Sequence, residues 1–302
     1  MNNNIFAVDI GGSKLMCGVI EPNGHPIETV ESKYPAGYTI DTVIALIKEN
    51  FDKLKHHCCS VCGVAVPGLC DYKSGEWLYS PFSGIGNIPI AQIIGDITGM
   101  PVFADNDVNI SAIAEKYFGV CKDVSDFLWV TVSNGIGGGL YLENKLYRGQ
   151  NLSAGEVGHF IVEQGGRKCG CGNNGCLEAL ASGASIAAIY NEKTGQNLSA
   201  KDIADLARGG DETALQVWQS AGSYIGKAAS YAVNLLGIDT VVLGGGAAEA
   251  FDLLQPSAQK TLNSLVFKKA NPNAKILHSS LARQAALLGC AALTLENTKN
   301  KM

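Results

Sequence analysis

Short runs of hydrophobic residues alternate with helical patterns along the first part of the chain. The continuous apolar runs predict β-strands at 5–10, 15–20, 61–66 and 102–104. Apolar positions three and four residues apart predict helices over 41–55, 90–98 and 108–117. A sheet with helices packed on its faces is the architecture that this alternation favours, so the predicted fold class is α/β.

A glycine-rich turn after a strand occurs twice in the chain. In the first copy residues 11–14 follow the strand 5–10, and in the second copy residues 133–139 follow the strand 127–132. This repetition predicts an internally duplicated fold, with two α/β lobes facing each other across a cleft.

The second half continues the same alternation. Its further strands are predicted at 140–142, 240–243 and 275–277. Its helices are predicted over 177–192, 200–207, 211–236, 253–265 and 283–295. We expect an N-terminal lobe of residues 1–118, joined by the C-terminal helix 283–302, and a larger lobe of residues 119–282.

The composition excludes several classes of protein. With 46% hydrophobic and 17% charged residues among 302, the chain is too apolar for a disordered protein, and no apolar stretch is long enough to span a membrane. The net charge of −5 and the absence of a basic run disfavour a nucleic-acid partner. The N-terminal residues have no signal-peptide pattern, so we expect a cytoplasmic protein.

Gly11, Gly12, Ser13 and Lys14 form the first glycine turn. It lies between two strands and not before a helix, so it is neither a Walker loop nor a dinucleotide fingerprint. A tight hairpin turn can still direct backbone N–H groups and a hydroxyl at a phosphate, and Asp9 at the preceding strand end could bind a metal. An ordinary glycine hairpin is the alternative.

Two further glycine segments suggest ligand contacts. Residues 133–139 include four glycines, more than a turn needs, and with the first turn they suggest a clamp on a polyphosphate. Gly244, Gly245 and Gly246 follow the strand 240–243 and could support the base or ribose of a nucleotide. A buried junction between a strand and a helix would have the same sequence, so both interpretations stay open.

Polar residues gather where the strand 102–104 ends and the next helix begins. Asp105, Asn106, Asp107 and Asn109 lie at a carboxyl edge of the sheet, where open α/β sheets bind ligands. An Asp at such a junction either caps the helix or accepts a proton from a ligand. Because the four residues cannot all cap one helix, we expect some of them to contact a ligand.

The ten cysteines, without a signal peptide, are expected to be thiols or metal ligands and not disulfides. Cys169, Cys171 and Cys176 fall within eight residues, and with His159 they supply the ligands of a closed tetrahedral zinc site. Four protein ligands leave no position for water, so the Zn²⁺ is predicted to be structural. Free thiols near an unrelated histidine are the alternative.

Two glutamates flank the cysteine cluster in the sequence. Glu156 lies three residues before His159, and Glu178 lies two residues after Cys176. Carboxylates on one rigid scaffold accept hydrogen bonds well from neighbouring hydroxyls of a sugar. Solvated acidic side chains are the alternative.

Along nearly its whole length the chain resembles the ROK family of sugar kinases and related regulators, which has the actin and hexokinase type of duplicated ATPase fold. The resemblance is strongest in Glu156-Val157-Gly158-His159 and in residues 169–178, which match the family's sugar and zinc signature position for position. It implies an ATP-dependent kinase that phosphorylates a hexose or an N-acetylhexosamine at the 6-hydroxyl. Glucose and N-acetylmannosamine are the sugars expected first, with Mg²⁺ accompanying ATP and a structural Zn²⁺.

The resemblance also implies a role for each candidate residue. Asp107 would be the general base. The implied sugar contacts are Gly68, Asn106, Glu156, His159 and Glu178. The implied ATP contacts are Asp9, Gly11, Gly12, Ser13, Lys14, Asn134, Gly135, Gly137, Gly138, Gly244, Gly245 and Gly246. A homo-oligomer, either a dimer or a tetramer, is expected on the same basis.

Several positions depart from the family pattern. Ser13 replaces a common Thr but keeps the hydroxyl. Ser133 and Asn134 stand where the second phosphate loop usually has Gly and Thr. Phe82 and Ile85 stand where many members have Asn and Trp. These departures suggest a catalytically impaired sugar sensor as an alternative to a kinase. A ROK-type sugar-binding regulator is a further alternative, because the family includes repressors that keep the sugar site. Regulators of this family carry an N-terminal helix-turn-helix, and no basic recognition helix precedes Asp9, so we expect the kinase.

Overall fold

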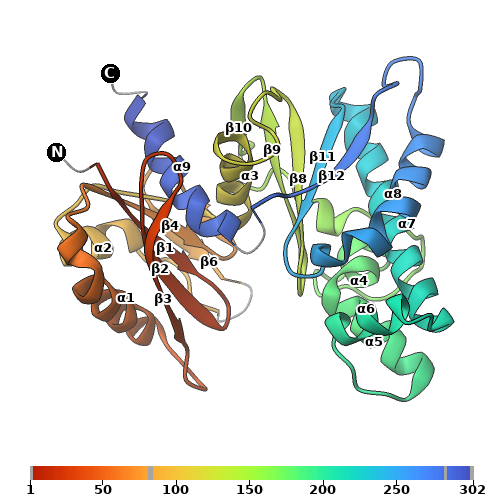
Figure 1. Cartoon of the computed structure of the whole chain (residues 1–302), viewed down its shortest axis with the longest axis horizontal. Coiled ribbons are helices and arrows are strands. Elements are labelled where there is room, and N and C mark those ends of the chain that lie inside the picture. Colours follow the sequence, from red (N-terminus) through yellow and green to blue (C-terminus); the bar gives the residue numbers. More distant parts are fainter. Residues whose placement is uncertain (1–2, 81–83, 282–283, 300–302) are drawn as a thin grey trace. The chain divides into compact units, whose positions relative to one another are not determined.

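The structure, a computed structural model, describes residues 3–80, 84–281 and 284–299 (Figure 1). They form two compact units, each with its own sheet and its own hydrophobic core. Unit 1 contains Met1–Lys122, Arg148–Ser153 and Gln284–Met302, and unit 2 contains Asp123–Tyr147 and Ala154–Arg283.

Unit 1 is built on a five-stranded sheet in the order β3-β2-β1-β4-β7. The strands are β1 (Ile5–Ile10), β2 (Lys14–Ile20), β3 (Pro26–Lys33), β4 (Val61–Val66) and β7 (Val102–Asn106). The first three form antiparallel hairpins, whereas β1, β4 and β7 are parallel. Asp9 pairs in register with Ala65, and Ala65 with Asp105, so the ends of β1 and β7 reach the same edge of the sheet.

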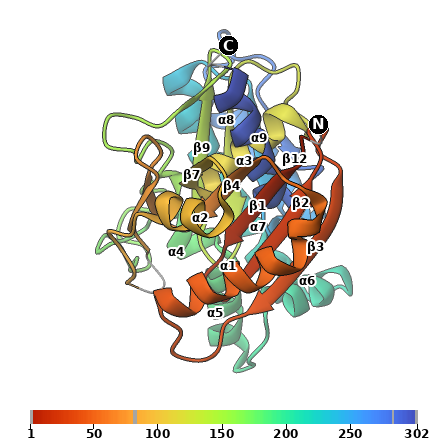
Figure 2. The same cartoon turned by 90° about the vertical axis from the view of Figure 1, so that its left-hand side faces the viewer.

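Helices cover both faces of this sheet. α1 (Ile40–Leu54) and α2 (Ile90–Thr98) pack on one face, which is turned to the viewer in Figure 2, and α3 (Asp107–Tyr117) and α9 (Ala285–Lys299) pack on the other. A short 3-10 helix, η1 (Lys55–His57), extends α1, and a hairpin of β5 (Leu69–Asp71) and β6 (Glu76–Tyr79) follows β4. α9 approaches β4 closely because Gly63 has no side chain. A Cβ there would lie 2.1 Å from the carbonyl oxygen of Cys290.

Unit 2 has a second five-stranded sheet, in the order β10-β9-β8-β11-β12. Its strands are β8 (Phe127–Val132), β9 (Ile136–Leu142), β10 (Lys145–Tyr147), β11 (Thr240–Gly244) and β12 (Lys275–His278). The hairpins β8–β9 and β9–β10 are antiparallel, and β8, β11 and β12 are parallel. Strand order and directions are those of unit 1, which confirms the duplication and the α/β class expected from the sequence.

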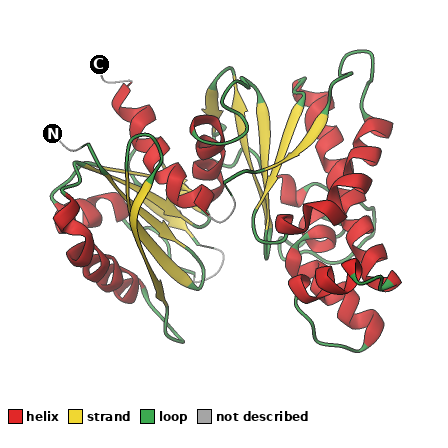
Figure 3. Cartoon of the chain, in the orientation of Figure 1, coloured by secondary structure: helices red, strands yellow, loops and turns green. Residues whose placement is uncertain are grey.

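The helices of unit 2 lie on one side of its sheet (Figure 3). They are α4 (Leu177–Ala181), α5 (Gly183–Thr194), α6 (Ala200–Arg208), α7 (Glu212–Leu236) and α8 (Phe251–Leu265), with the short 3-10 helices η2 (Val157–His159) and η3 (Ala248–Ala250). Val130 and Val132 of β8 pack with Trp218 and Ile225 of α7 in one core. In the described part of the chain no helix is long and apolar enough to cross a membrane.

Local structure differs from the predictions in three places. The segment 177–192, predicted as one helix, is interrupted at Ser182, whose hydroxyl accepts the N–H of Ser185 and caps α5. Of the predicted loop 133–139 only the first three residues form the turn, because the remaining glycines belong to β9. Strands β5, β6 and β10 are too short to leave a hydrophobic pattern.

Among the departures from the family pattern, Ile85 packs against the core of unit 1, and Phe82 lies outside the described residues.

Candidate active site

In unit 1, hydrogen bonds hold the turn between β1 and β2. The Gly11 N–H donates to the carbonyl oxygen of Lys14 at 3.0 Å. The Tyr38 hydroxyl donates to the carbonyl oxygen of Gly12 at 2.9 Å. Gly12 and Ser13 are exposed at the tip of the turn. The turn therefore offers solvent its backbone and one hydroxyl, which is the chemistry that a phosphate-binding turn needs.

Two charged residues flank this turn. Asp9 is half-buried, and burial raises the pKa of its carboxyl to about 6 although the charge of Lys14 opposes the shift. The Lys14 ammonium pairs with Glu31 of β3 at 2.5 Å. Because both partners of that pair are more than 40% exposed, it is a weak interaction that a phosphate can displace.

Asn106 organises the junction between β7 and α3. Its Oδ1 accepts the N–H groups of Val108 and Asn109 at 2.9 and 3.1 Å, and so caps α3. Its Nδ2 donates to the Gly68 carbonyl oxygen at 2.6 Å and to Oδ1 of Asp107 at 3.1 Å. The two donors and the two acceptor sites of the amide are thus all used within unit 1. Asn106 and Gly68, both expected at the sugar, hold Asp107 in place in this structure.

Asp107 is the first residue of α3, and its carboxyl is half-buried. Burial, followed by the negative charge of Asp9, raises the pKa of Asp107 to about 7, against the opposing effect of the Val108 N–H, which lies 3.0 Å from Oδ1. A carboxyl with a pKa near neutral pH is well suited to accept and release a proton.

A buried ion pair supports the same junction, and sequence reasoning missed it. Asp105 is 1% exposed, and its Oδ2 accepts Nε and Nη2 of Arg148, both at 2.7 Å. Its Oδ1 accepts the Asn106 N–H at 2.8 Å and Nδ2 of Asn109 at 3.1 Å. The Arg148 guanidinium also lies over the Tyr72 ring, 4.0 Å from its centroid. Arg148 thereby fixes the carboxylate that holds the first turn of α3, and no local motif marks it because the partners are 43 residues apart.

In unit 2, Glu178 contacts the second glycine turn. Its Oε2 accepts the N–H of Ile136 at 2.9 Å. A Cβ on Gly135 would lie 2.5 Å from the same oxygen, so glycine at this position lets the carboxylate approach the turn. From the other side, the N–H of Gly183 donates to the carbonyl oxygen of Ser133 at 2.7 Å. Glu178, expected as a sugar ligand, therefore also supports the turn.

Packing within unit 2 explains several glycines that were expected to contact ATP. A Cβ on Gly138 would lie 2.4 Å from a backbone carbonyl oxygen, and one on Gly244 would lie 2.0 Å from the Trp129 ring. Gly245 has a φ of +92°, which disfavours any other residue there. The interpretation as a buried strand-to-helix junction thus accounts for Gly244 and Gly245. At Gly246 an added Cβ would meet no atom closer than 3.9 Å.

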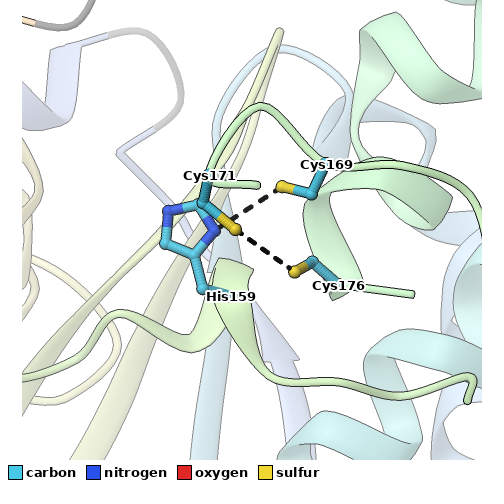
Figure 4. A group of neighbouring side chains, drawn as sticks. All are labelled: His159, Cys169, Cys171 and Cys176. Atoms are coloured by element: carbon cyan, nitrogen blue, oxygen red, sulfur yellow. Dashed lines mark hydrogen bonds between the residues drawn. The ribbon is translucent and has the colours of Figure 1, made fainter. Parts of the chain in front are cut away.

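Three cysteines and one histidine converge in unit 2, as Figure 4 shows. Cys171 Sγ lies 3.6 Å from Cys176 Sγ, and Cys169 Sγ lies 3.8 Å from His159 Nδ1. All four ligand atoms are within 4.8 Å of one another. Thiolates in a tetrahedron with Zn–S bonds of about 2.3 Å are roughly 3.8 Å apart, so this group is compatible with zinc. None of the ten cysteines, all within the described residues, forms a disulfide.

Backbone contacts also hold the cysteine loop. Lys168 and Asn174 form an isolated antiparallel bridge across it. A Cβ on Gly175 would lie 1.6 Å from the Glu163 carbonyl oxygen, so only glycine permits this approach. The Tyr224 hydroxyl on α7 donates to Oε1 of Glu163 at 2.9 Å and anchors the loop to the helices.

Glu156 and His159 lie together at η2. Whereas Nδ1 of His159 faces Cys169, its Nε2 lies 3.9 Å from Oε2 of Glu156. One ring nitrogen can therefore ligate a metal while the other stays next to the carboxylate. Both side chains are exposed, 56% for Glu156 and 38% for His159, and so are accessible to a ligand.

Each unit thus brings a different part of the predicted site together. Unit 1 gathers the first glycine turn with Asp9 and the Asp107 junction. Unit 2 gathers the cysteine cluster, Glu156 and the turn supported by Glu178. Asn134 is exposed in that turn, and Gly137 pairs with Thr131 inside the β8–β9 hairpin.

Known proteins match this chain along most of its length. The family model described as ROK family matches residues 5–297. The xylose repressor of Bacillus subtilis (strain 168) is 32% identical, over 78% of this chain and 61% of the repressor. The glucokinase of Halalkalibacterium halodurans is 28% identical, over 93% of this chain and 92% of the glucokinase. The crystal structure of a ROK family glucokinase from Streptomyces griseus in complex with glucose and AMPPNP superimposes with a TM-score of 0.85 at 26% identity, covering 96% of this chain and 98% of that one. This chain spans about six tenths of the length of the xylose repressors that it matches.

Proposed function

Because the chain belongs to the ROK family, with the duplicated actin-like ATPase fold, we propose that it is an ATP-dependent kinase of a hexose or an N-acetylhexosamine. The proposed acceptor is the 6-hydroxyl, and glucose and N-acetylmannosamine are the first candidate sugars. The observation that carries the proposal is Asp107, a half-buried carboxyl with a pKa of about 7 that Asn106 holds at the start of α3.

In the proposed reaction the Asp107 carboxylate accepts the proton of the attacking hydroxyl. The sugar oxygen forms a bond to the γ-phosphorus of ATP, the bond from that phosphorus to the bridging oxygen breaks, and ADP leaves with the electron pair. The raised pKa makes Asp107 a stronger base than an ordinary aspartate. A positioned general base contributes about 10²- to 10⁴-fold to the rate.

The two glycine turns are proposed to bind the phosphates of ATP. Ser13 offers a hydroxyl and Gly12 its backbone, and Lys14 can exchange its exposed pair for a phosphate oxygen. Asn134 and Gly135 in the second turn are proposed to contribute in the same way. Gly246, beside open space, is the residue that we propose for the adenosine contact.

Asp9 is proposed to hold the Mg²⁺ that accompanies ATP. Its carboxyl is half-buried, and its raised pKa of about 6 reflects a charge that lacks sufficient solvation. A bound divalent cation supplies positive charge that offsets the phosphates. Asp9 also acts on Asp107 through its charge, so occupation of this site is expected to lower the pKa of the base.

The sugar is proposed to bind Glu156, His159 and Glu178. One carboxylate oxygen of Glu178 accepts the Ile136 N–H, and the other oxygen can accept a sugar hydroxyl. The amide of Asn106 can donate to the sugar only by exchanging one of its present hydrogen bonds. The primary role that we propose for Asn106 is therefore to position the base.

We propose that the cysteine cluster binds a structural Zn²⁺. Cys169, Cys171, Cys176 and Nδ1 of His159 would supply four protein ligands, and a four-coordinate site of this kind is closed to water. Bound zinc supplies rigidity here, because it ties the loop to η2. The His159 ring is then held with Nε2 next to Glu156.

A coupled ADP-release assay tests the proposal. The wild type is assayed with magnesium ATP against glucose, mannose, fructose, allose, N-acetylglucosamine and N-acetylmannosamine. We expect one of these sugars to drive turnover and Asp107→Asn to reduce it by at least about 100-fold, with sugar binding retained. Asp96→Asn, at an exposed position on α2, is the matched control and should keep full activity. Absence of sugar-dependent ADP formation with all six sugars would contradict the kinase.

A sugar-binding regulator is the second candidate. The similarity to a xylose repressor, at 32% identity, favours it, since the glucokinase match is 28% identical. Such a protein binds its sugar without transferring a phosphoryl group. Calorimetric titration with the same six sugars separates the two, because binding without sugar-dependent ADP formation supports the regulator or an impaired sensor.

A further inference from the structure

A second group of metal-ligating side chains lies in unit 1, away from the residues used above. Glu28 is on β3, and His56 and His57 are in η1, at the end of α1. We refer to these three residues as the histidine–glutamate cluster. All three reach solvent, and the proposed kinase chemistry uses none of them.

The three ligand atoms of this cluster converge on one point. His57 Nε2 lies 2.8 Å and His56 Nε2 lies 3.8 Å from the same oxygen, Oε2 of Glu28. The three atoms are within 4.8 Å of one another, and the two imidazole rings are 4.0 Å apart between centroids. Ligands at about 2.0–2.1 Å from a tetrahedral ion are roughly 3.3 Å apart, so the two distances to Glu28 bracket the spacing that an ion requires.

The orientation of His56 is that of a metal-binding imidazole. Its Nδ1 lies 2.9 Å from the carbonyl oxygen of Lys53, which can only accept, so Nδ1 carries the proton. In the neutral ring Nε2 then presents its lone pair to the Glu28 carboxylate. The lone pair of His56 Nε2 and the carboxylate oxygen, 3.8 Å apart, can both bond to one cation, which would replace the present hydrogen bond between His57 Nε2 and the same oxygen. A backbone carbonyl that fixes the far ring nitrogen is the usual support of a histidine ligand.

The neighbouring lysines do not neutralise Glu28. Lys53 pairs with Glu49 and Lys55 pairs with Asp52, each at 2.7 Å. In the described part of the chain the ion-pair partners of Glu28 are the two imidazoles alone. A carboxylate whose partners are imidazoles is available to a metal ion without the loss of a lysine pair.

We propose that Glu28, His56 and His57 form a second metal site, which takes a divalent first-row transition-metal ion such as Zn²⁺ or Co²⁺. Imidazole and carboxylate ligands select such ions, and water completes the coordination because the site is exposed. The ligand atoms that converge here, among the described residues, include no cysteine sulfur. The ion links β3 to η1, since its ligands Glu28 and His57 are 29 residues apart in the chain.

Zinc stoichiometry under reducing conditions tests the proposal. Metal-free protein is dialysed against micromolar Zn²⁺, and bound zinc is counted by elemental analysis. We expect His56→Gln and Glu28→Gln each to bind one equivalent less than the wild type, with affinity at this site reduced by at least about 10-fold. His25→Gln is the matched control, because His25 also faces a surface carboxylate, Glu21, but has no second imidazole; it should bind as much as the wild type. Equal zinc content in the wild type and His56→Gln would overturn the proposal.

Cobalt spectroscopy identifies the ligands independently of the cysteine cluster. Cys171→Ser protein loaded with Co²⁺ should retain one ion with a weak visible spectrum and lose most of the strong band of thiolate-to-cobalt charge transfer. Adding His56→Gln should abolish the remaining ion. If all Co²⁺ bound by the wild type shows thiolate bands and His56→Gln leaves the spectrum unchanged, the histidine–glutamate cluster holds no metal and the proposal is overturned. Neither experiment depends on kinase activity.

Discussion

Asp107→Asn is expected to make the protein more stable while removing its proposed activity. The substitution removes a charge from a half-buried site and keeps the acceptor for the Asn106 amide and the Val108 N–H. The pKa of Asp107 is about 7 in the folded chain and 3.8 in a free aspartate. One pKa unit corresponds to about 1.4 kcal/mol, and part of the shift is shared with Asp9, so we expect a gain of about 2–4 kcal/mol once the carboxyl is ionised.

The sign of this effect depends on pH. Between the two pKa values of 3.8 and about 7 the folded chain binds more protons at Asp107 than the unfolded chain, so stability falls as pH rises through this window. Above this pH window the Asp107 carboxyl is ionised in the folded wild type, which then bears the full free-energy cost of the half-buried charge. Thermal unfolding of ligand-free, magnesium-free wild type and variant should therefore show a Tm difference of about 5–10 °C at alkaline pH that shrinks towards pH 4.

A neighbouring substitution of the same kind provides the control. Asp105→Asn lies two residues away but leaves the Arg148 guanidinium, 15% exposed, without its carboxylate. Burial also raises the pKa of Asp105, against the opposing charge of Arg148. The cost of leaving the guanidinium buried without a partner exceeds the gain from removing the carboxylate, so Asp105→Asn should destabilise the protein by about 3–5 kcal/mol, the opposite sign. A Tm difference between wild type and Asp107→Asn that is absent, or constant from acid to alkaline pH, would refute the raised pKa. Unchanged turnover in Asp107→Asn would remove it as the base.

Four further outcomes are expected. Arg148→Met should lower the free energy of unfolding by about 3–5 kcal/mol, because it leaves the Asp105 carboxylate buried without its cation. Urea unfolding measures this change, and a loss below about 1 kcal/mol would show that the ion pair does not stabilise the junction. Cys171→Ser should lower bound zinc and Tm together, and a variant as stable and as rich in zinc as the wild type would exclude a structural zinc site. Glu178→Gln should leave the stability unchanged, since an amide oxygen can still accept the Ile136 N–H of the second glycine turn. It should reduce kcat/KM for the sugar by about 10- to 100-fold. Unchanged steady-state kinetics would show that Glu178 does not contact the sugar. Gly244→Ala should destabilise the fold, because the added methyl group would force the Trp129 indole to move. Gly246→Ala should stay folded and bind ATP more weakly. Equal ATP affinities of Gly246→Ala and wild type in calorimetry would show that Gly246 does not contact the adenosine.

Much of the fold is encoded locally, and so the sequence alone predicts it. The strand Ile5–Ile10 follows from a continuous apolar run, and the helix Glu212–Leu236 follows from a helical period of apolar residues. The duplication follows because both copies repeat the order strand, glycine turn, strand. Three of the four ligands of the cysteine cluster lie within eight residues, so their spacing is also a local property.

The tertiary structure decided which of these residues act together and what the glycines are for. Asp105 and Arg148 are 43 residues apart, and Glu28 and His57 are 29 residues apart, so no local pattern connects either pair. The sequence does not show whether a ligand or a protein side chain occupies the space beside a glycine. At Gly244 the folded structure shows that this space holds the Trp129 indole. Hydrophobic periodicity shows which side of one segment faces the core and which side faces solvent. Ion pairs, raised pKa values and close backbone approaches depend on distances between segments, which only the folded chain defines.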